Sequence, residues 1–508
     1  MTHHTAPTRI HHLVDHNAAV RPDAPAIKDC DGRVYSWAEY AKLTEDAARL
    51  LADHGAAPGE RVLIVGENCL ALPVLINAAS RIGAWAVPVN ARMSAAEVAR
   101  IAAHAQPVVT LFTSHISREA VNHAGDATPC PTSFGALHVV PGLPDPEPVD
   151  DSADTPAILL YTTGTTGDPK GVMLSHANLL FAAEASMTLR SLVPEDHVYG
   201  ALPLTHVFGV ASMMMAAACA GSMIELATRF NPAKLFEALR AGATVMPAVP
   251  QMHALLMAHA EELGEATLGA PRLRYVSSGA APLDPSWKRK AEAFYGLPLQ
   301  NGYGMTESTA GVTGTRNAIG DPDASVGPPL PGCEVRLDLT FGEDPDVGEV
   351  LTRGPHVMVG YFRNPTATAQ TVQDGWLRTG DLGRIDPQGR LHIVGRSKEL
   401  IIRGGFNVYP PEVEAALNDH PDVVQSAVIG RSRGGDEEVI AFVQPRAPGM
   451  VDAETLRSFA ADRLAGYKRP SRIFVVDSLP AAATGKILKH QFAKHFADLL
   501  AEEDQPSV

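Results

Sequence analysis

A short segment between residues 161 and 171 has the strongest chemical signal in the chain. It reads Tyr-Thr-Thr-Gly-Thr-Thr-Gly-Asp-Pro-Lys-Gly and follows the apolar run 157–160. An apolar run that ends in glycines and hydroxyls predicts a strand leading into a loop rich in hydrogen-bond donors. Glycines let the backbone approach a ligand, N–H groups and threonine hydroxyls donate, and Lys170 adds positive charge. The segment therefore predicts a site for a polyphosphate.

The expected phosphate-binding residues are the threonines, glycines and lysine of this loop: Thr162, Thr163, Gly164, Thr165, Thr166, Gly167 and Lys170. The loop is not a Walker A motif, because no Ser or Thr follows Lys170 and the glycine spacing differs. A threonine-rich turn without a ligand is the alternative interpretation. The coincidence of glycines, hydroxyls and a lysine makes it the weaker one.

Strand-like and helix-like patterns alternate on both sides of this loop. Residues 61–65 and 83–88 predict strands, and residues 71–81 predict a helix between them. The Pro- and Asp-rich residues 141–155 predict a linker before the strand that leads into the loop. The alternation then resumes to about residue 300, which indicates an α/β architecture with buried parallel strands.

The pattern of predicted strands and helices changes twice in the C-terminal third of the chain. Short strands with Gly and Pro turns, from about 325 to 395, predict a small β-barrel-like subdomain. Beyond a break near 395–398 we expect a small α+β domain. Its expected helices are 411–419, 453–465 and 486–500, and its expected strands are 423–430, 438–444 and 471–476. The expected organisation is an N-terminal domain 1–395, with two α/β layers and the β-rich part, and a C-terminal domain 396–508.

Composition excludes several classes of function. The 508 residues require more than one domain, and a net charge of −15 argues against binding to nucleic acid or to an anionic membrane. Five scattered cysteines predict neither a disulfide framework nor a zinc site, and favour a cytoplasmic protein. No signal peptide is evident. The apolar stretch 207–224 is rich in small residues, and predicts a buried helix entering a strand rather than a transmembrane segment.

Five separated segments together indicate a family. They are 161–171, 277–282 (Ser-Ser-Gly-Ala-Ala-Pro), 301–308 (Asn-Gly-Tyr-Gly-Met-Thr-Glu-Ser), 376–381 (Trp-Leu-Arg-Thr-Gly-Asp), and 395–412 followed by 480–489. In this order they resemble the adenylate-forming superfamily of acyl-CoA synthetases, carrier-linked adenylation domains and luciferases. The resemblance covers about residues 10–495. It implies the fold expected above, with a C-terminal domain that acts as a mobile lid.

The resemblance implies an ATP site made largely of the second, third and fourth segments. In it the Asn301 amide meets a purine edge, the Tyr303 ring stacks on the purine, and Thr306 donates to the α-phosphate. Glu307 holds Mg²⁺ through oxygen, and Asp381 and Arg396 contact the ribose. The full implied set beyond the loop is Gly279, Ala280, Asn301, Gly302, Tyr303, Gly304, Thr306, Asp381, Arg396 and Lys486. Read alone, Tyr303 could be a core aromatic and Asp381 a turn former.

Two lysines have implied roles in the chemical steps. Lys486, in a glycine loop near the C-terminus, would reach the carboxylate and the α-phosphate together and offset the charge of the reaction. Lys398 occupies the hinge position about which the C-terminal domain pivots. Lys489, near Lys486, is expected to be an ordinary surface lysine.

The acyl and CoA sites are implied by the remaining positions. His206 matches the aromatic gate between the nucleotide and acyl pockets, although a single His among apolar residues is usually structural. The acyl pocket is expected to include His206, Phe208, Ser212, Ala281 and Val312, and the CoA site Gly404, Gly405, Phe406 and Lys468. Because the candidate lining holds no Arg or Lys, an acid with a second carboxylate is not expected. Ile402 replaces a lysine of plant hydroxycinnamate ligases, which favours medium- or long-chain fatty acids slightly over aryl acids.

The resemblance implies a ligase that uses ATP, Mg²⁺, a carboxylic acid and coenzyme A. The acid would first form an acyl-AMP, and the thiol of CoA would then displace AMP to give a thioester. The alternative is an acyl-AMP ligase that loads a separate carrier protein. A non-catalytic AMP-binding regulator is a third class, against which the presence of Glu307, Asp381 and Lys486 argues. The sequence permits a homodimer.

Overall fold

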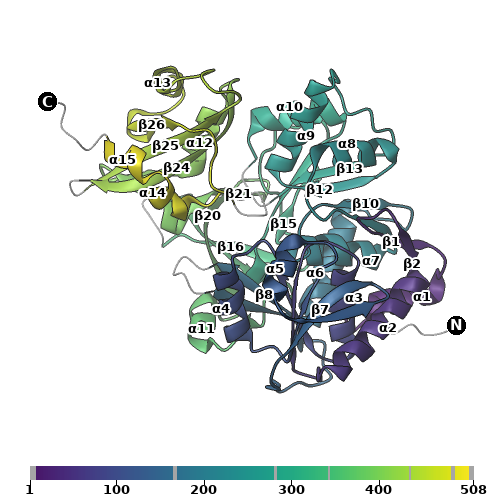
Figure 1. Ribbon diagram of the computed structural model, residues 1–508. Helices are drawn as coiled ribbons and strands as arrows, with labels where there is room; N and C mark the ends of the chain where they lie inside the picture. The colour runs from purple at the N-terminus through teal and green to yellow at the C-terminus, as the bar shows by residue number, and fades with distance from the viewer. Residues whose placement is uncertain are drawn as a thin grey trace.

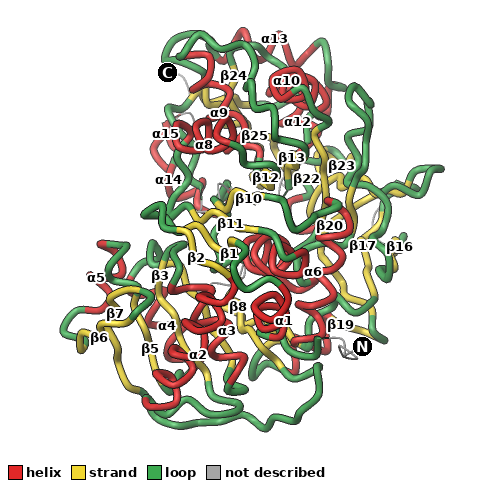
Figure 2. Tube along the Cα trace, turned by 90° about the vertical axis from the view of Figure 1, so that its right-hand side faces the viewer, coloured by secondary structure: helices red, strands yellow, loops and turns green. Residues whose placement is uncertain are grey.

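The computed structural model describes residues 7–163, 169–279, 283–340, 344–433, 436–481 and 487–502. It has a large N-terminal part built on two eight-stranded sheets and one five-stranded sheet, and a smaller α+β C-terminal domain (Figure 1). The α/β fold class predicted from the sequence is confirmed. Figure 2 shows the second sheet, with β10 to β13, above the first sheet, with β3 and β8.

The first sheet contains the phosphate-loop strand. Its order is β18 (Gly360–Tyr361), β9 (Pro169–Ser175), β8 (Pro156–Thr163), β4 (Trp85–Asn90), β3 (Arg61–Gly66), β5 (Val109–Phe112), β7 (Gly135–Pro141) and β6 (Thr128–Thr132). Residues Val62 and Ile64 of β3 face one core, and Leu63 and Val65 face the other. Both faces of this parallel strand are buried, which explains its unbroken apolar sequence.

Helices cover the two faces of the first sheet. They are α2 (Trp37–Asp53), α3 (Ala71–Arg81), α4 (Ala95–Ala105) and α5 (Arg118–Ala124). The strand at 61–65 and the helix at 71–81 are confirmed, and the next strand begins two residues later than expected. The predicted linker at 141–155 is irregular from residue 142, but the Glu147 N–H donates to the Gly59 carbonyl at 3.1 Å. Because β8 pairs with β4, this segment joins two parts of one sheet.

The second sheet is mostly parallel and supplies several of the sequence motifs. Its order is β15 (Thr313–Gly314), β14 (Leu299–Tyr303), β13 (Tyr275–Ser278), β12 (Val245–Ala248), β10 (His197–Gly200), β11 (Met223–Leu226), β1 (Pro25–Lys28) and β2 (Val34–Ser36). The helices of this part are α8 (Pro232–Ala241), α9 (Pro250–Glu262) and α10 (Pro285–Tyr295). The motifs at 277–282 and 301–308 thus begin in the last residues of two neighbouring parallel strands, β13 and β14, whose ends lie at the same edge of the sheet.

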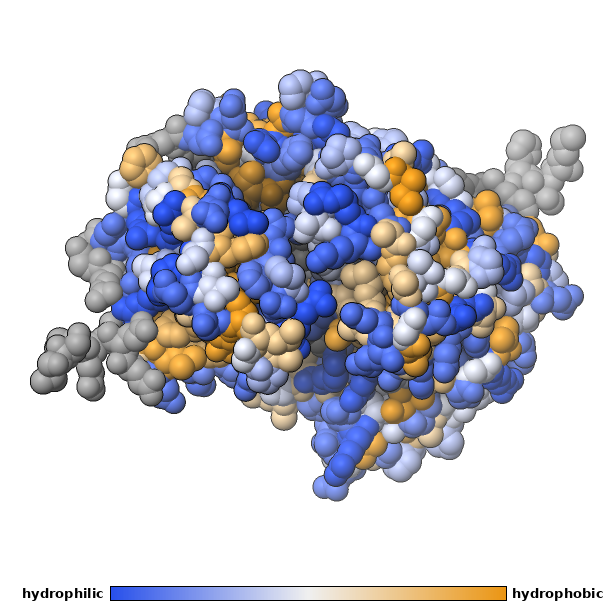
Figure 3. Space-filling model, turned by 90° about the horizontal axis from the view of Figure 1, so that it is seen from above, coloured by the Kyte–Doolittle hydropathy of each residue, from blue (hydrophilic) through white to orange (hydrophobic). Residues whose placement is uncertain are grey.

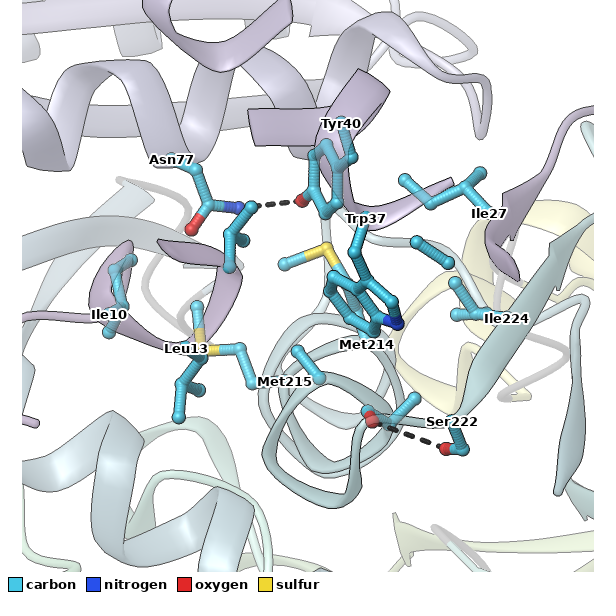
Figure 4. A pocket seen from close by; sticks show the side chains of 14 residues that line it. Ile10, Leu13, Ile27, Trp37, Tyr40, Asn77, Met214, Met215, Ser222 and Ile224 are labelled. Atoms are coloured by element: carbon cyan, nitrogen blue, oxygen red, sulfur yellow. Dashed lines mark hydrogen bonds between the residues drawn. The ribbon is translucent and has the colours of Figure 1, made fainter. Parts of the chain in front are cut away.

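The same large part contains four more helices: α1 (His12–Val20), α6 (His176–Arg190), the π-helix η1 (Phe208–Met215) and α7 (Ala216–Ala220). The stretch 207–224 is therefore a buried helix that enters β11, as predicted. No helix in the described ranges has the length and apolar character needed to cross a membrane. Met214 and Met215 border a space of about 20 Å³ that Trp37 and Tyr40 also line (Figure 4).

The third sheet is smaller and antiparallel. It consists of β16 (Glu334–Asp338), β17 (Gly348–Arg353), β20 (Trp376–Ile385) and β19 (Val372–Gln373), with β21 (Leu391–Arg396) beside β20. Among the described strands no pairing closes this sheet, so the barrel-like closure expected from the sequence is absent there. The short strand β18, which lies between β17 and β19 in the chain, pairs with β9 of the first sheet.

The C-terminal domain has a three-stranded sheet beside a hairpin. Its elements are η3 (Ser397–Glu399), β22 (Ile401–Arg403), β23 (Phe406–Val408), α12 (Pro410–Asn418), β24 (Val423–Arg433), β25 (Asp436–Pro445), α13 (Ala453–Ala461), η4 (Gly466–Lys468) and β26 (Arg472–Val475). The expected helix 486–500 is wrong: η5 (Lys489–Gln491), α14 (Phe492–His495) and α15 (Ala497–Glu502) replace it. Phe492 and Phe496 both pack on Phe442, and this packing accompanies the break at Phe496.

The surface seen from above is mostly hydrophilic, with hydrophobic residues in small groups between the polar ones (Figure 3). None of the five cysteines, all of which lie in the described part of the chain, forms a disulfide. These observations agree with the composition.

Candidate active site

The two arms of the phosphate loop are an antiparallel hairpin. Thr162 of β8 lies opposite Lys170 of β9, and Thr163 lies opposite Pro169. The tip, with Gly164, Thr165, Thr166 and Gly167, lies outside the described residues. The structure therefore fixes where the loop leaves the sheet and where it returns.

A tyrosine outside the recognised motifs connects this hairpin to Glu307. The Lys170 Nζ lies 4.8 Å from the centre of the Tyr361 ring, and the Tyr361 hydroxyl donates to Glu307 Oε1 at 2.9 Å. Tyr361 reaches this position because β18 pairs with β9, opposite Val172. Burial and the charge of Glu307 raise the pKa of Tyr361, so its hydroxyl is a proton donor. Tyr361 thereby contacts a lysine over its ring and a carboxylate at its hydroxyl.

Asp381 has one neutral and one positively charged partner. The Tyr303 hydroxyl donates to Asp381 Oδ2 at 2.6 Å, and Arg396 Nε lies 3.1 Å from Asp381 Oδ1. Asp381 and Arg396 are opposite each other in β20 and β21. Burial, and then the charge of Asp381, raise the pKa of Tyr303 well above its usual range. Three of the four side chains proposed for purine and ribose binding, Tyr303, Asp381 and Arg396, therefore form one connected group.

Both polar atoms of the Asn301 side chain, expected to meet a purine, have hydrogen-bond partners within the protein. Its Nδ2 donates to the Ser325 carbonyl at 3.0 Å, and its Oδ1 accepts from the Gly302 N–H at 2.9 Å. The side chain thus links the end of β14 to Ser325. Gly304 is also needed within the protein, since a Cβ there would lie 1.3 Å from the Ala310 carbonyl oxygen. Thr306 and Glu307, both 8% exposed, follow in η2 (Thr306–Ser308).

The proposed acyl side begins where the π-helix meets the end of β13. The Phe208 N–H donates to His206 Nδ1 at 3.3 Å, which sets the His206 ring at the start of η1. The Phe208 ring lies against Gly279, where an added Cβ would be 3.1 Å from Phe208 Cε1. Val312 is fully buried. Ala280 and Ala281 lie outside the described residues.

One residue beside this group was missed by the sequence analysis. Arg190, the last residue of α6, donates from Nη2 to Ser212 Oγ at 2.7 Å and from Nη1 to the Ser212 carbonyl. Arg190 is 5% exposed, and burial lowers the pKa of its guanidinium. The motif positions alone predicted an acyl pocket without a cation, but Arg190 lies against Ser212 of that pocket. The sequence signal was an arginine that closes a largely apolar helix.

The residues expected to bind CoA share one surface of the C-terminal domain. Gly404 and Gly405 have φ values of 59° and 81°, which glycine adopts without strain. Phe406, 57% exposed, stacks on Tyr467 with ring centres 4.7 Å apart. The next residue, Lys468, lies 2.5 Å from Glu412. Lys398, the expected hinge residue, is in η3, directly after the strand that contains Arg396.

Lys486 lies outside the described residues, but the base of its loop is described. Ala481 and Ile487 form a bridge across that base. Lys489, expected to be a surface lysine, is instead largely buried: its Nζ lies 2.7 Å from Glu414 and 3.2 Å from Glu399. The two carboxylates raise the pKa of Lys489 against the opposing effect of burial. Lys489 thus ties the chain beyond Lys486 to the residue after Lys398.

Replacing Lys489 with methionine should destabilise the protein by about 3 kcal/mol. The change leaves Glu399 and Glu414 without their shared cation, and breaking a largely buried ion pair from one side typically has a cost of this size. Urea unfolding of the C-terminal domain would measure it, with Lys494→Met, at an exposed position, as the control. A loss no larger than that of the control would contradict the structural role of Lys489.

Comparison with known proteins agrees with the fold and the motifs. The model of the AMP-binding enzyme family matches residues 14–362, and that of the AMP-binding enzyme C-terminal domain matches residues 412–486. Feruloyl-CoA synthase of Amycolatopsis sp is 33% identical over 486 residues, covering 94% of this chain and 97% of that protein. 4-Coumarate–CoA ligase 5 of Oryza sativa subsp. japonica is 33% identical over 511 residues, covering 94% and 93%.

A solved structure shows the same architecture with nucleotide bound. The O-succinylbenzoate coenzyme A synthetase of Bacillus subtilis, in complex with ATP and magnesium ion, superposes with a TM-score of 0.80 at 27% identity. The match covers 94% of this chain and 98% of that one. Together with the two family models, these matches span nearly the whole chain. The chain belongs to the AMP-binding enzyme family, as an acyl-CoA synthetase of the adenylate-forming superfamily.

Proposed function

We propose that this protein joins an aryl or hydroxycinnamic acid to coenzyme A in two steps. The acid carboxylate attacks the α-phosphorus of ATP, which gives an acyl-AMP and pyrophosphate. The CoA thiol then attacks the acyl carbon, and AMP leaves. The observation that carries this proposal is the grouping of Lys170, Glu307, Tyr303 and Asp381, from three separate motifs, around the ends of β9 and β14.

The protein's own groups would act by position and charge. Lys170 and the loop 162–167 would hold the phosphates that leave as pyrophosphate. Tyr303 and the pair of Asp381 with Arg396 would hold the adenosine, and Thr306 would donate to the α-phosphate. Lys486 would neutralise charge where the new bond forms.

Glu307 fits a magnesium ion. Among the described residues no three His, Cys, Asp or Glu side chains gather so that they could hold a metal alone. Mg²⁺ in nucleotide sites usually takes one or two carboxylates together with phosphate oxygens and water, so Glu307 is a sufficient protein ligand. A bound Mg²⁺ would neutralise phosphate charge.

The acid is proposed to be aromatic rather than a long-chain fatty acid. The two relatives described above are named for hydroxycinnamic acids. Ser212, one of the proposed lining residues, accepts a hydrogen bond from Arg190, and such polar groups would meet the methyl end of a long chain unfavourably. The names of the relatives also support CoA over a separate carrier protein as the acceptor.

The two steps are proposed to use two orientations of the C-terminal domain, from residue 396, which pivots at Lys398. In one orientation Lys486 would serve adenylation. In the other Gly404, Gly405, Phe406 and Lys468 would border the CoA chain. A cytoplasmic location and a homodimer stay predictions from the sequence.

Exchange of pyrophosphate into ATP and CoA-dependent release of AMP would test the function. With ferulate, 4-coumarate, benzoate, octanoate and palmitate as acids, we expect kcat/KM for the first two to exceed that for the fatty acids about tenfold or more. A difference of this size corresponds to about 1.4 kcal/mol in the transition state. Exchange that is never followed by CoA-dependent AMP release would favour the carrier protein. Absence of exchange with every acid would exclude adenylation.

A further inference from the structure

Glu307 is a largely buried carboxylate whose side-chain partner is neutral. It is 8% exposed, and its Oε1 accepts from the Tyr361 hydroxyl at 2.9 Å. Within the described part of the chain, Glu307 forms no ion pair with a lysine, arginine or histidine. Asp381, the other carboxylate expected at the nucleotide, has Arg396 as well as a tyrosine. A buried carboxylate without a protein cation is costly, so Glu307 is suited to a cation that comes with a ligand.

The segment 358–361 holds Glu307 at two points. The Met358 N–H donates to the Glu307 carbonyl at 2.9 Å, and the Tyr361 hydroxyl holds the carboxylate. The second bond occupies one of the two carboxylate oxygens, so it also sets the direction of the other oxygen. Hydrogen bonds of this kind orient the ligands of metal ions in many proteins.

The backbone that carries Tyr361 is fixed by two neighbouring elements. On one side β18 pairs with β9, the strand that contains Lys170. On the other side the Tyr361 N–H donates at 2.9 Å to Thr368 Oγ1 of α11 (Pro365–Thr371). A Cβ on Gly360 would lie 2.8 Å from Thr368 Cγ2, so this approach of strand and helix requires glycine. Tyr361 is therefore held independently of Glu307, as a residue that orients another one must be.

We propose that Tyr361 is a positioning residue for the divalent cation that accompanies ATP. Its hydroxyl holds Glu307 Oε1 and thereby directs Oε2 toward the ion. Its ring contacts Lys170, which is expected to hold phosphates, so one side chain borders both charged groups. The proposal rests on the proposed function, since it needs Mg²⁺ bound together with ATP. The competing interpretation is that Tyr361 only joins β18 to η2 within the fold.

Binding of α,β-methylene-ATP, which cannot form an acyl-AMP, separates these interpretations without turnover. Equilibrium dialysis would give its dissociation constant in EDTA and with Mg²⁺ in excess, and the ratio of the two is the gain in affinity due to the ion. Tyr361→Phe keeps the ring beside Lys170 and removes the hydroxyl. It should lower this ratio about tenfold, the low end of what loss of a group that orients a metal ligand typically costs. The constant in EDTA should not change.

Tyr40→Phe is the matched control. Tyr40 is also a buried tyrosine, and its hydroxyl accepts from Asn77 Nδ2 at 2.8 Å. This substitution likewise removes a buried hydroxyl, but among residues to which no nucleotide contact is assigned. It should leave the ratio of the two dissociation constants unchanged.

A second background tests whether Tyr361 acts through Glu307. In Glu307→Gln, the further change Tyr361→Phe should not lower the ratio again, because the carboxylate that it orients is already absent. Thr371→Val removes a hydroxyl that interacts with the Tyr361 oxygen, and should lower the ratio in the same direction but less. That variant decides if Tyr361→Phe fails to fold.

The proposal is overturned if Tyr361→Phe weakens binding by the same factor in EDTA and in Mg²⁺, as a purely structural contact would. An unchanged ratio, or an equal fall of the ratio in the Glu307→Gln background, also overturns it. Pyrophosphate exchange by the native enzyme would then leave the proposed function standing. A native enzyme that neither binds the analogue nor shows exchange with any acid would remove both.

Discussion

Replacing Lys486 with alanine should slow formation of the acyl-AMP by roughly 10²- to 10³-fold, the effect typical of removing one group that stabilises developing charge. Attack of a carboxylate on the α-phosphate brings together two negatively charged groups, and a lysine that reaches both offsets that repulsion. Formation of the thioester from supplied acyl-AMP should stay within a few-fold of the native rate, because Lys486 is proposed to serve only one orientation of the C-terminal domain.

Two assays on one variant measure this contrast. Pyrophosphate exchange reports the first step, and thioester formation from synthetic acyl-AMP and CoA reports the second. Lys494→Ala is the matched control, since Lys494 is an exposed lysine in the same domain. Equal loss of both steps in Lys486→Ala, with a normal control, would refute the alternation of the domain between two orientations.

The local pattern of apolar residues was sufficient to predict the elements that are buried along their whole length. The strand at 61–65 is apolar throughout because each face packs on its own core, and the helix at 71–81 follows it directly. The expected helix at 486–500 failed because its helical pattern competes with tertiary packing. Phe492 and Phe496 both meet Phe442, a residue of β25 about fifty positions earlier in the chain.

The sequence predicted the individual motifs of the candidate site, but not the side-chain contacts that join them. Glu307 and Asp381 stand in recognisable segments, and the structure gives each a tyrosine partner. Tyr361 could not be found, because it lies in a two-residue strand whose partner, β9, is nearly two hundred residues away. Arg190 and Lys489 were missed for the same reason: their environments depend on long-range contacts with Ser212 and with Glu399.

The contact between Tyr303 and Asp381 leads to the second large prediction. Asp381→Asn should raise KM for ATP by about ten- to a hundredfold, because hydrogen bonds that involve a charged group are typically worth about 1.5–3 kcal/mol. The amide can still accept from the Tyr303 hydroxyl, but it loses the charge that pairs with Arg396 and one of the two acceptor oxygens. Ribose hydroxyls need such acceptors.

Initial rates at varied ATP and saturating acid would measure the effect, and KM for the acid should change far less. Asp374→Asn is the control, since Asp374 is exposed in the turn before β20 and its φ of 51° is one that asparagine tolerates. If Asp381 only maintained the third sheet, Asp381→Asn would lower the thermal midpoint and raise both KM values together. A selective rise in KM for ATP at unchanged thermal stability would support direct contact of Asp381 with the nucleotide.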